Sequence, residues 1–220
     1  MYTPGYFKMN DPDEIRNFIN ENSFAILISN NEGKINATHI PVLFESGEGS
    51  KGFLYGHFAK ANQQWKNIDK EVLVIFPGAH KYISPTWYES NQTVPTWSYI
   101  SVHIYGNIEI VNSKEKKIKL VKDLVKYFES DESSYSTDQL KQSYFDGLIN
   151  GIVGFKIEIT RIEGKKKISQ NHPEERQKRV IDKLKEIGDD DSQKIVEKMK
   201  ENLEKLQSND QNNITDMNGN

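Results

Sequence analysis

The longest alternating stretch of the chain is Trp97-Ser-Tyr-Ile-Ser-Val-His-Ile-Tyr-Gly-Asn-Ile-Glu-Ile-Val111. Its side chains change character at every residue, which is the period of a β-strand with two different faces. The aliphatic face consists of Ile100, Val102, Ile104, Ile108 and Ile110. The other face consists of Trp97, Tyr99, Ser101, His103 and Tyr105. The first face predicts a core strand, and the second predicts contact with a ligand or another subunit rather than with bare solvent.

Five further segments have the composition of strands: 24–30, 35–44, 52–58, 72–76 and 151–162. The first two flank Asn31-Glu32-Gly33, a connection typical of a hairpin. Helices are expected at 12–22, after the cap Asp11-Pro12-Asp13-Glu14, and at 114–128, 137–145, 173–187 and 192–206. Successive strands with few helices between them argue against a parallel sheet. The pattern predicts a mainly β fold with peripheral helices (α+β), built on a small antiparallel barrel.

Composition excludes several classes of protein. The 220 residues carry a net charge of −3 and no cysteine, which excludes disulfides, thiol nucleophiles and cysteine-ligated metals. The chain contains neither a membrane-length apolar run nor a signal peptide, so we expect a cytoplasmic protein. Gly47-Glu-Gly-Ser-Lys-Gly52 matches a dinucleotide fingerprint, but it lies between two predicted strands and is interpreted as a hairpin connection.

Two regions concentrate residues suited to ligand binding. Gly56-His-Phe-Ala-Lys-Ala-Asn-Gln-Gln-Trp65 ends a predicted strand and begins a predicted helix, where amide groups beside Lys60 could hold an anion. The simpler interpretation is a capped helix with a solvated lysine. Aromatic and hydroxyl side chains then surround a loop in Tyr82-Ile-Ser-Pro-Thr-Trp-Tyr88 and Val94-Pro-Thr-Trp-Ser-Tyr99. They fit a flat ligand, an interface, or a loop folded on its own rings.

These segments, together with Gly164-Lys-Lys-Lys-Ile-Ser-Gln-Asn171 and the N-terminal Met-Tyr-x-Pro-x-Tyr-Phe, resemble the PaiB family. That family is described as FMN-binding split-barrel proteins and negative transcriptional regulators, related to the pyridoxamine-phosphate oxidase group. The resemblance implies a PaiB-like split-barrel domain at 1–187. We expect an extra C-terminal helix at 188–207 and a disordered Asn-rich tail at 208–220.

The resemblance also implies FMN as the cofactor and a homodimer with FMN at the subunit interface. It assigns Lys60 to the FMN phosphate, helped by the backbone of Ala59, Ala61 and Asn62. The arginine–lysine clamp of the oxidase group is not evident, because Ala61 follows Lys60. The remaining candidate contacts are Thr38, His39, His57, Ser84, Trp87, Thr96 and Trp97. The resemblance assigns no catalytic residue and no metal ligand.

Three functions stay open at this point. The family suggests a flavin-dependent negative transcriptional regulator, and the alternative is an FMN-dependent oxidoreductase acting on a small molecule. Haem binding at His39, His57 or His103 is the third. The run Lys165-Lys-Lys167 is interpreted as a solvated charge run. Direct DNA binding is not expected, because the chain is acidic and lacks a recognisable pair of reading helices.

Overall fold

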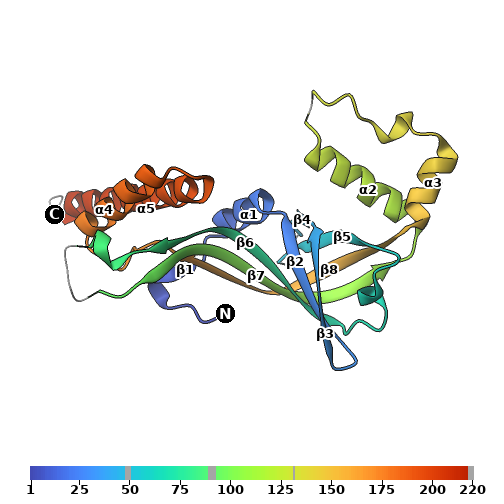
Figure 1. The fold of residues 1–220 in the computed structure, drawn as a ribbon, viewed down its shortest axis with the longest axis horizontal. Coiled ribbons are helices and arrows are strands. Elements are labelled where there is room, and N and C mark those ends of the chain that lie inside the picture. The colour runs from blue at the N-terminus through green and yellow to red at the C-terminus, as the bar shows by residue number, and fades with distance from the viewer. Residues whose placement is uncertain (48–50, 89–92, 131, 218–220) are drawn as a thin grey trace. The chain divides into compact units, whose positions relative to one another are not determined.

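The computed structural model describes residues 1–47, 51–88, 93–130 and 132–217, with side chains as far as Lys205. Its strands form an antiparallel sheet in the order β3-β2-β6-β7-β8-β5-β4, and β1 pairs with β8 beside this path (Figure 1). The strands are β1 (Lys8–Met9), β2 (Phe24–Asn31), β3 (Lys34–Pro41), β4 (Leu43–Glu45), β5 (Phe53–Ala59), β6 (Glu71–Ile83), β7 (Thr96–Val111) and β8 (Ile152–Lys167). The helices are α1 (Pro12–Glu21), α2 (Lys114–Phe128), α3 (Gln142–Asn150), α4 (Glu174–Ile187) and α5 (Asp190–Met217), with short 3₁₀ turns η1 (Gly5–Phe7), η2 (Gln63–Trp65), η3 (Pro85–Trp87) and η4 (Thr137–Gln139).

The chain divides into two compact units. Unit 1 consists of Met1–Asn10, Pro77–Ser101 and the segment from Gly164 onward, and unit 2 consists of Asp11–Phe76 and Val102–Glu163. The long strands β6, β7 and β8 each contribute residues to both units. Each unit has a core of its own. The most buried side chains of unit 2 include Leu27, Leu54, Phe58, Val74, Phe76, Ile104, Phe155 and Ile157, and those of unit 1 include Ile83, Ile168, Val180, Leu184, Ile195 and Met199.

The sheet of unit 2 curls toward a barrel. The hairpin of β2 and β3 turns at Glu32 and Gly33, which both have positive φ (53° and 84°), as a tight hairpin turn requires. β3 begins the strand order, yet it also contacts β5, which lies next to the other end of that order. This approach gives unit 2 its barrel-like interior. The barrel predicted from the sequence is therefore present.

The strand expected at 35–44 is instead two strands with different partners. β3 ends at Pro41 and pairs with β2, whereas β4 begins at Leu43 and pairs with β5. Between them the amide of Val42 donates to Ser23 O at 3.0 Å. Because proline cannot donate a hydrogen bond to a ladder, Pro41 is a natural point for the chain to leave β2. The glycine-rich segment after β4 joins two antiparallel neighbours, as predicted, although residues 48–50 lie outside the described part.

Two strands are longer than expected. β6 continues from Phe76 through Pro77 and Gly78 to Ile83, and β8 continues past Ile162 to Lys167. The second extension pairs with β1, where Lys8 lies opposite Lys165 and Met9 opposite Gly164. A Cβ at Gly164 would lie 2.8 Å from Met9 O, so only glycine permits this close approach. Two-residue strands such as β1 have no period that sequence reasoning could detect.

The helices follow their caps. Asp11 caps α1 by accepting from the amides of Asp13 (2.9 Å) and Glu14 (3.5 Å), as predicted. The helical piece expected at 137–145 is the 3₁₀ turn η4 followed by α3. Gly188, with φ 70°, ends α4. Among the described residues, each helix is too short or too polar to cross a membrane.

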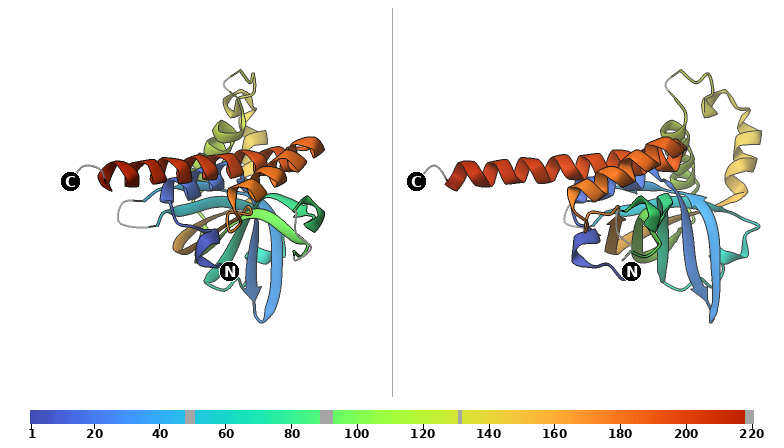
Figure 2. Two further views of the ribbon diagram at one scale, coloured as in Figure 1. Left: turned by 90° about the vertical axis from the view of Figure 1, so that its left-hand side faces the viewer. Right: turned by 60° about the vertical axis from the view of Figure 1, so that its left-hand side comes forward.

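Helices α4 and α5 pack side by side in unit 1, and α5 runs back along α4 and continues past the residues at which α4 begins (Figure 2). We expected a helix that ends near Leu206 and a disordered tail after it. The structure instead continues α5 to Met217. The sequence between Asp190 and Met217 contains neither proline nor glycine, so nothing in it stops the helix.

Candidate functional site

Lys60 lies in unit 2 at the point where β5 gives way to η2. Its backbone amide donates to Gly151 O at 2.8 Å, and its carbonyl accepts from the indole Nε1 of Trp65 at 3.1 Å. These two contacts fix the backbone while the side chain is exposed. Within the described part of the chain, the Lys60 ammonium has no carboxylate partner. The backbone at Lys60 is therefore fixed in place, and the ammonium group that it carries is available to bind an anion.

The predicted helix after Asn62 is the three-residue turn η2, so it provides no helix dipole for an anion. The amide of Asn62 donates to Ala59 O at 2.9 Å. Ala59 is the last residue of β5 and pairs with Ile152. The Ala61 amide has no acceptor among the described residues, and the Ala59 amide points away from β8, because Lys60 and Gly151 form the hydrogen-bonded pair of this ladder. The Lys60 ammonium and the Ala61 amide are thus donors available to a phosphate here.

Thr38 and Asn62 contact each other. The Asn62 side-chain amide donates to Thr38 Oγ1 at 2.9 Å, and Asn62 Oδ1 accepts from the Gln64 amide at 2.8 Å. The Thr38 hydroxyl in turn donates to Gln64 Oε1 at 2.5 Å. The structure thus brings these two candidate residues together. Their polar groups hold the Lys60 loop on β3.

Gln64 is the centre of this group, and sequence reasoning did not single it out. Its side chain is 4% exposed and its Nε2 donates to Ser29 Oγ (3.0 Å), Leu27 O (3.2 Å) and Asn36 O (3.4 Å). A buried amide with all its hydrogen-bonding groups satisfied rigidifies its surroundings. Gln64 therefore locks η2, and with it Lys60, onto β2 and β3. The only available signal was a glutamine pair between an asparagine cap and a tryptophan.

His39, His57 and His103 do not converge. Each lies on the face of its strand opposite the core residues, and within the described residues no three histidine or acidic side chains form a metal-binding group. His39 is exposed beside Phe24, with ring centroids 6.0 Å apart. Burial lowers the pKa of His57 and of His103 below its usual value, so both are neutral at pH 7.

His57 has one unusual feature. Its Nδ1 is buried and lacks a hydrogen-bond partner among the described residues. His57 lies directly opposite Gly154 on β8, and a Cβ at Gly154 would meet Lys117 and Leu120 of α2. Directly paired residues share a face of the sheet, so His57 lies on the face that α2 covers.

The other candidate residues belong to unit 1. Ser84 caps η3 by accepting from the Thr86 amide at 3.2 Å, and Trp87 ends this turn half-buried. Thr96 begins β7 and accepts a hydrogen bond from the Lys167 ammonium. Thr96 and Trp97 are neighbours in the chain and point to opposite faces of β7. Ser84 thus has a clear structural role, whereas Trp97 does not.

Trp97 is 52% exposed and belongs to a cluster of rings on β6 and β7. Its ring centroid lies 5.9 Å from that of Tyr82, edge to face, and 6.2 Å from that of His80. Exposed aromatic rings of this kind offer a flat apolar wall with polar edges. The interpretation of a loop folded on its own aromatics therefore does not apply to Trp97, because these residues lie on strands.

The lysine run of the Gly164–Asn171 motif is not solvated, contrary to expectation. It belongs to β8, where Lys165 is buried and Lys166 and Lys167 are half-buried. The motif then turns the chain into α4. Ser169 adopts a positive φ of 66°, and Gln170 accepts from the Ile168 amide (2.7 Å) while donating to Lys166 O (2.5 Å). The motif therefore has a structural role as a strand end and turn.

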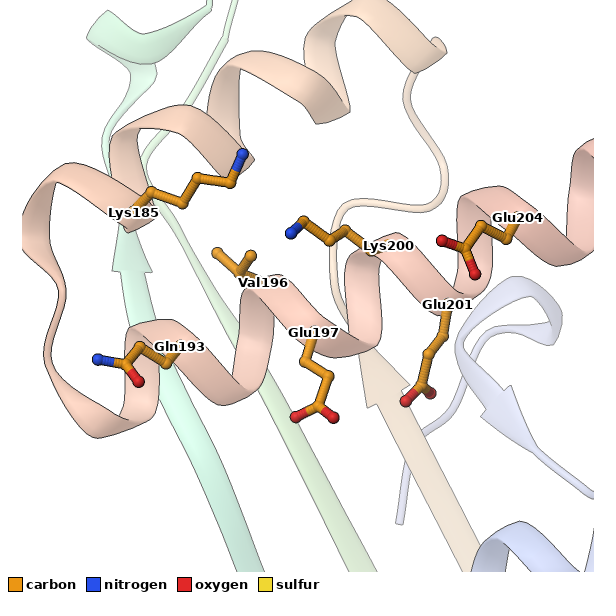
Figure 3. A pocket seen from close by; sticks show the side chains of 7 residues that line it. All are labelled: Lys185, Gln193, Val196, Glu197, Lys200, Glu201 and Glu204. Atoms are coloured by element: carbon orange, nitrogen blue, oxygen red, sulfur yellow. The ribbon is translucent and has the colours of Figure 1, made fainter.

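A cavity of about 380 Å³ lies between α4 and α5 in unit 1 (Figure 3). Its lining residues are Lys185, Gln193, Val196, Glu197, Lys200, Glu201 and Glu204. Three carboxylates outnumber the two ammonium groups, and the lining contains no aromatic ring. Like charges repel, so this cavity does not fit the phosphate of a flavin nucleotide.

FMN requires cationic and N–H donors at its phosphate, polar groups along the ribityl chain and flat walls at the ring. In unit 2, the unpaired Lys60 ammonium and the Ala61 amide fit the phosphate. In unit 1, the exposed Trp97 ring fits a flavin wall. The residues present in each unit therefore fit the part of FMN that they would contact.

Comparison with known proteins agrees with this chemistry. Residues 1–161 match the model of a family described as "Putative FMN-binding domain". The chain is 37% identical over 207 residues to the Bacillus subtilis protein named "Protease synthase and sporulation protein PAI 2", and the match covers 93% of this chain and 99% of that protein. A match of this extent includes the first part of α5, so the resemblance continues beyond Ile187, where we expected it to end.

Solved structures show the same fold. The flavocytochrome Anf3 from Azotobacter vinelandii superimposes with a TM-score of 0.56 at 15% identity, covering 74% of this chain and 70% of that one. A conserved hypothetical protein from Mycobacterium tuberculosis gives a TM-score of 0.56 at 15% identity, covering 79% and 94%. These matches confirm the split-barrel fold predicted from the sequence. By its family match and its similarity to PAI 2, the chain belongs to the PaiB-like family of FMN-binding split-barrel proteins, and its cofactor is FMN.

Proposed function

We propose that the chain is a flavin-dependent regulatory protein of the PaiB type, which holds the FMN phosphate at Lys60. The observation that carries the FMN contact is the Lys60 ammonium, which has no carboxylate partner in the described part of the chain and stands on a backbone fixed by Gly151 and Trp65. The regulatory part is supported by the B. subtilis relative, whose name refers to protease synthesis and sporulation rather than to a reaction. When bound, FMN would supply redox chemistry or a redox-dependent signal.

In this proposal each candidate residue has a defined task. Lys60 and the Ala61 amide bind the phosphate, while Asn62, Thr38 and Ala59 hold the loop that carries them. Trp97 and Trp87 form walls for the flavin ring, and Ser84 and Thr96 offer hydroxyl groups. In a dimer, the phosphate contacts and the ring walls can come from different subunits. His39 and His57 complete the proposed contacts.

The phosphate assignment is tested by comparing FMN with riboflavin, which lacks the phosphate. A charge-assisted contact contributes about 1.5–3 kcal/mol to binding. Lys60→Ala should therefore lower the affinity for FMN about 10- to 150-fold and leave the affinity for riboflavin nearly unchanged. Lys34→Ala, an exposed lysine on β3, is the matched control and should change neither. Equal losses for FMN and riboflavin would rule out the contact.

We also propose a homodimer. We predicted this from the aromatic face of β7, and an apolar face across β3, β2 and β6 supports it. Ile35 is 82% exposed and Phe24 is 60% exposed, and the neighbouring Ile26 and Ile28 are half-buried. A contiguous exposed apolar face is typical of an interaction site. Light scattering should give twice the chain mass of 25.4 kDa.

Substitution distinguishes this face from other exposed apolar positions. Ile35→Glu should produce monomers, whereas Ile187→Glu, at an exposed isoleucine of α4, should not. A wild-type monomer at micromolar concentration would contradict the proposal.

Regulation would be indirect. The basic segment suspected of touching DNA is engaged within unit 1, since Lys165 is buried and Lys167 donates to Thr96. Because these lysines are buried or half-buried on β8, their ammonium groups are poorly placed to reach the phosphates of a DNA backbone and release its counterions. A gel shift at about 150 mM salt should therefore show no sequence-specific complex.

The second candidate function is a flavin-dependent oxidoreductase acting on a small molecule. The observation that favours it is the exposed ring cluster at Trp97, which leaves room for a reactant. Reoxidation of bound, reduced FMN by added small molecules, followed by absorbance, distinguishes the two. Haem binding is not proposed, because the three histidines do not converge.

A further inference from the structure

Unit 1 contains a lysine that is almost completely buried. Lys165 is 8% exposed, and its ammonium donates to the carbonyl of Tyr2 at 3.0 Å. The same nitrogen lies 5.1 Å from the ring centroid of Tyr99 and 5.9 Å from that of Tyr2. Among the described residues, no carboxylate pairs with it. A neutral carbonyl and two aromatic rings are thus the groups that contact this ammonium among the described residues.

A buried ammonium without a counter-charge is unfavourable, because a single carbonyl does not replace its hydration. Such a group is stabilised when an anion binds beside it. The cover over Lys165 is slight. Tyr2 lies before η1, outside any helix or strand, and is itself 84% exposed.

An aromatic surface leads to this lysine. It consists of His80 and Tyr82 on β6 and Trp97 and Tyr99 on β7, all in unit 1. Trp97 and Tyr99 are two residues apart and so share one face of β7. The ring contacts of Trp97 with Tyr82 and His80 extend the surface to β6. The surface thus runs from an exposed tryptophan to a buried cation.

We propose that this aromatic surface and Lys165 bind a planar aromatic anion. Its ring would lie against Trp97, and its anionic group would take the place of the Tyr2 carbonyl at the Lys165 ammonium. The occupant is an aromatic anion other than FMN, because the proposed function places the FMN phosphate at Lys60. The proposal therefore does not rest on the proposed function.

Calorimetric titration of the purified protein with 1-naphthoate and with its neutral analogue 1-naphthamide tests charge selectivity. Lys165→Met keeps the length of the side chain and removes the charge. It should therefore lower the affinity for naphthoate at least tenfold and leave the affinity for naphthamide unchanged. Trp97→Ala should weaken both, because both stack. Lys183→Met is the matched control, since Lys183 is an exposed lysine of α4 paired with Glu186 at 2.8 Å.

Titration with FMN separates this site from the cofactor site, and Lys165→Met should leave the affinity for FMN unchanged. If Lys165→Met weakens FMN binding by the same factor as naphthoate binding while Lys183→Met does not, the lysine belongs to the cofactor site and the proposal is overturned. If Lys165→Met lowers the affinity for naphthoate alone, the site takes an aromatic anion other than FMN. That result stands even if the protein binds no FMN. The proposal is overturned if Lys165→Met leaves the affinity for naphthoate unchanged, or if the wild-type protein does not bind naphthoate.

Thermal unfolding separates binding from a structural role. Removing an uncompensated buried charge should leave the melting temperature unchanged or higher. A melting temperature several degrees lower, with naphthoate binding retained, would make Lys165 a structural contact of Tyr2 and overturn the proposal.

Discussion

Replacing Gln64 by leucine tests whether one buried amide holds the Lys60 loop in place. Leucine is close in size, so the change removes hydrogen bonds without opening a large cavity. The amide contributes its hydrogen bonds to Thr38, Ser29 and Leu27 O, besides a longer one to Asn36 O. Each net hydrogen bond contributes about 0.5–1.5 kcal/mol. Thr38 keeps its bond from Asn62, and Ser29 keeps its bond to Asn31, so neither hydroxyl is left without a partner.

The expected loss in the free energy of unfolding is therefore about 2–4 kcal/mol. Urea unfolding followed by circular dichroism measures it, as a lower midpoint at unchanged m-value. Gln63→Leu is the matched control, because Gln63 is exposed and its side chain bonds only Ala61 O among the described residues, so its effect should stay within about 0.5 kcal/mol. FMN affinity should fall with Gln64→Leu as well, since the loop loses its anchor. Equal midpoints for the two variants would refute the assigned role.

Two further predictions concern pH and close packing. The Lys81 ammonium, followed by the Ser192 amide, lowers the pKa of Asp189 to about 2, so the stabilisation from this pair is present above the ordinary pKa of an aspartate and is lost as pH falls toward 2. Asp189→Asn should lower stability at pH 6 and show less further loss between pH 4 and 2, and an unchanged acid limb in thermal melts would exclude this role. Gly106→Ala should destabilise unit 2 strongly because its Cβ would lie 2.5 Å from Glu158 O, whereas Gly147→Ala meets nothing within 4 Å in α3 and should stabilise by about 0.5–1 kcal/mol in urea unfolding. Similar effects at both glycines would contradict the packing described.

The strands and helices that could be predicted from the sequence are those whose signal lies within a few neighbouring residues. β7 was found from its alternation, α2 from its helical period, and α1 from its Asp11 cap. In each case neighbouring residues contain the whole signal. The PaiB-like motifs then supplied the split barrel and FMN, which periodicity alone could not.

The errors arose where a distant segment decides the structure. β6 continues through Pro77 and Gly78, residues that normally mark a turn. Lys165 looks solvated in the sequence, yet Tyr2 and Tyr99, far away in the chain, bury it. The role of Gln64 likewise depends on four hydrogen-bond partners on β2 and β3. No local pattern reports such contacts, so the buried polar residues of the candidate site could not be predicted.

The sheet order places unusual demands on the chain while the ribosome is still synthesising it. β5 pairs with β8, so that Ala59 meets Ile152 and Phe53 meets Glu158. At about 5–20 residues per second, β5 emerges many seconds before its partner exists. During that interval its unpaired edge can join with other nascent chains. The period of greatest aggregation risk for this protein is therefore its translation, and slowing or stalling the ribosome between β5 and β8 should lower the yield of folded molecules more than stalling after β8.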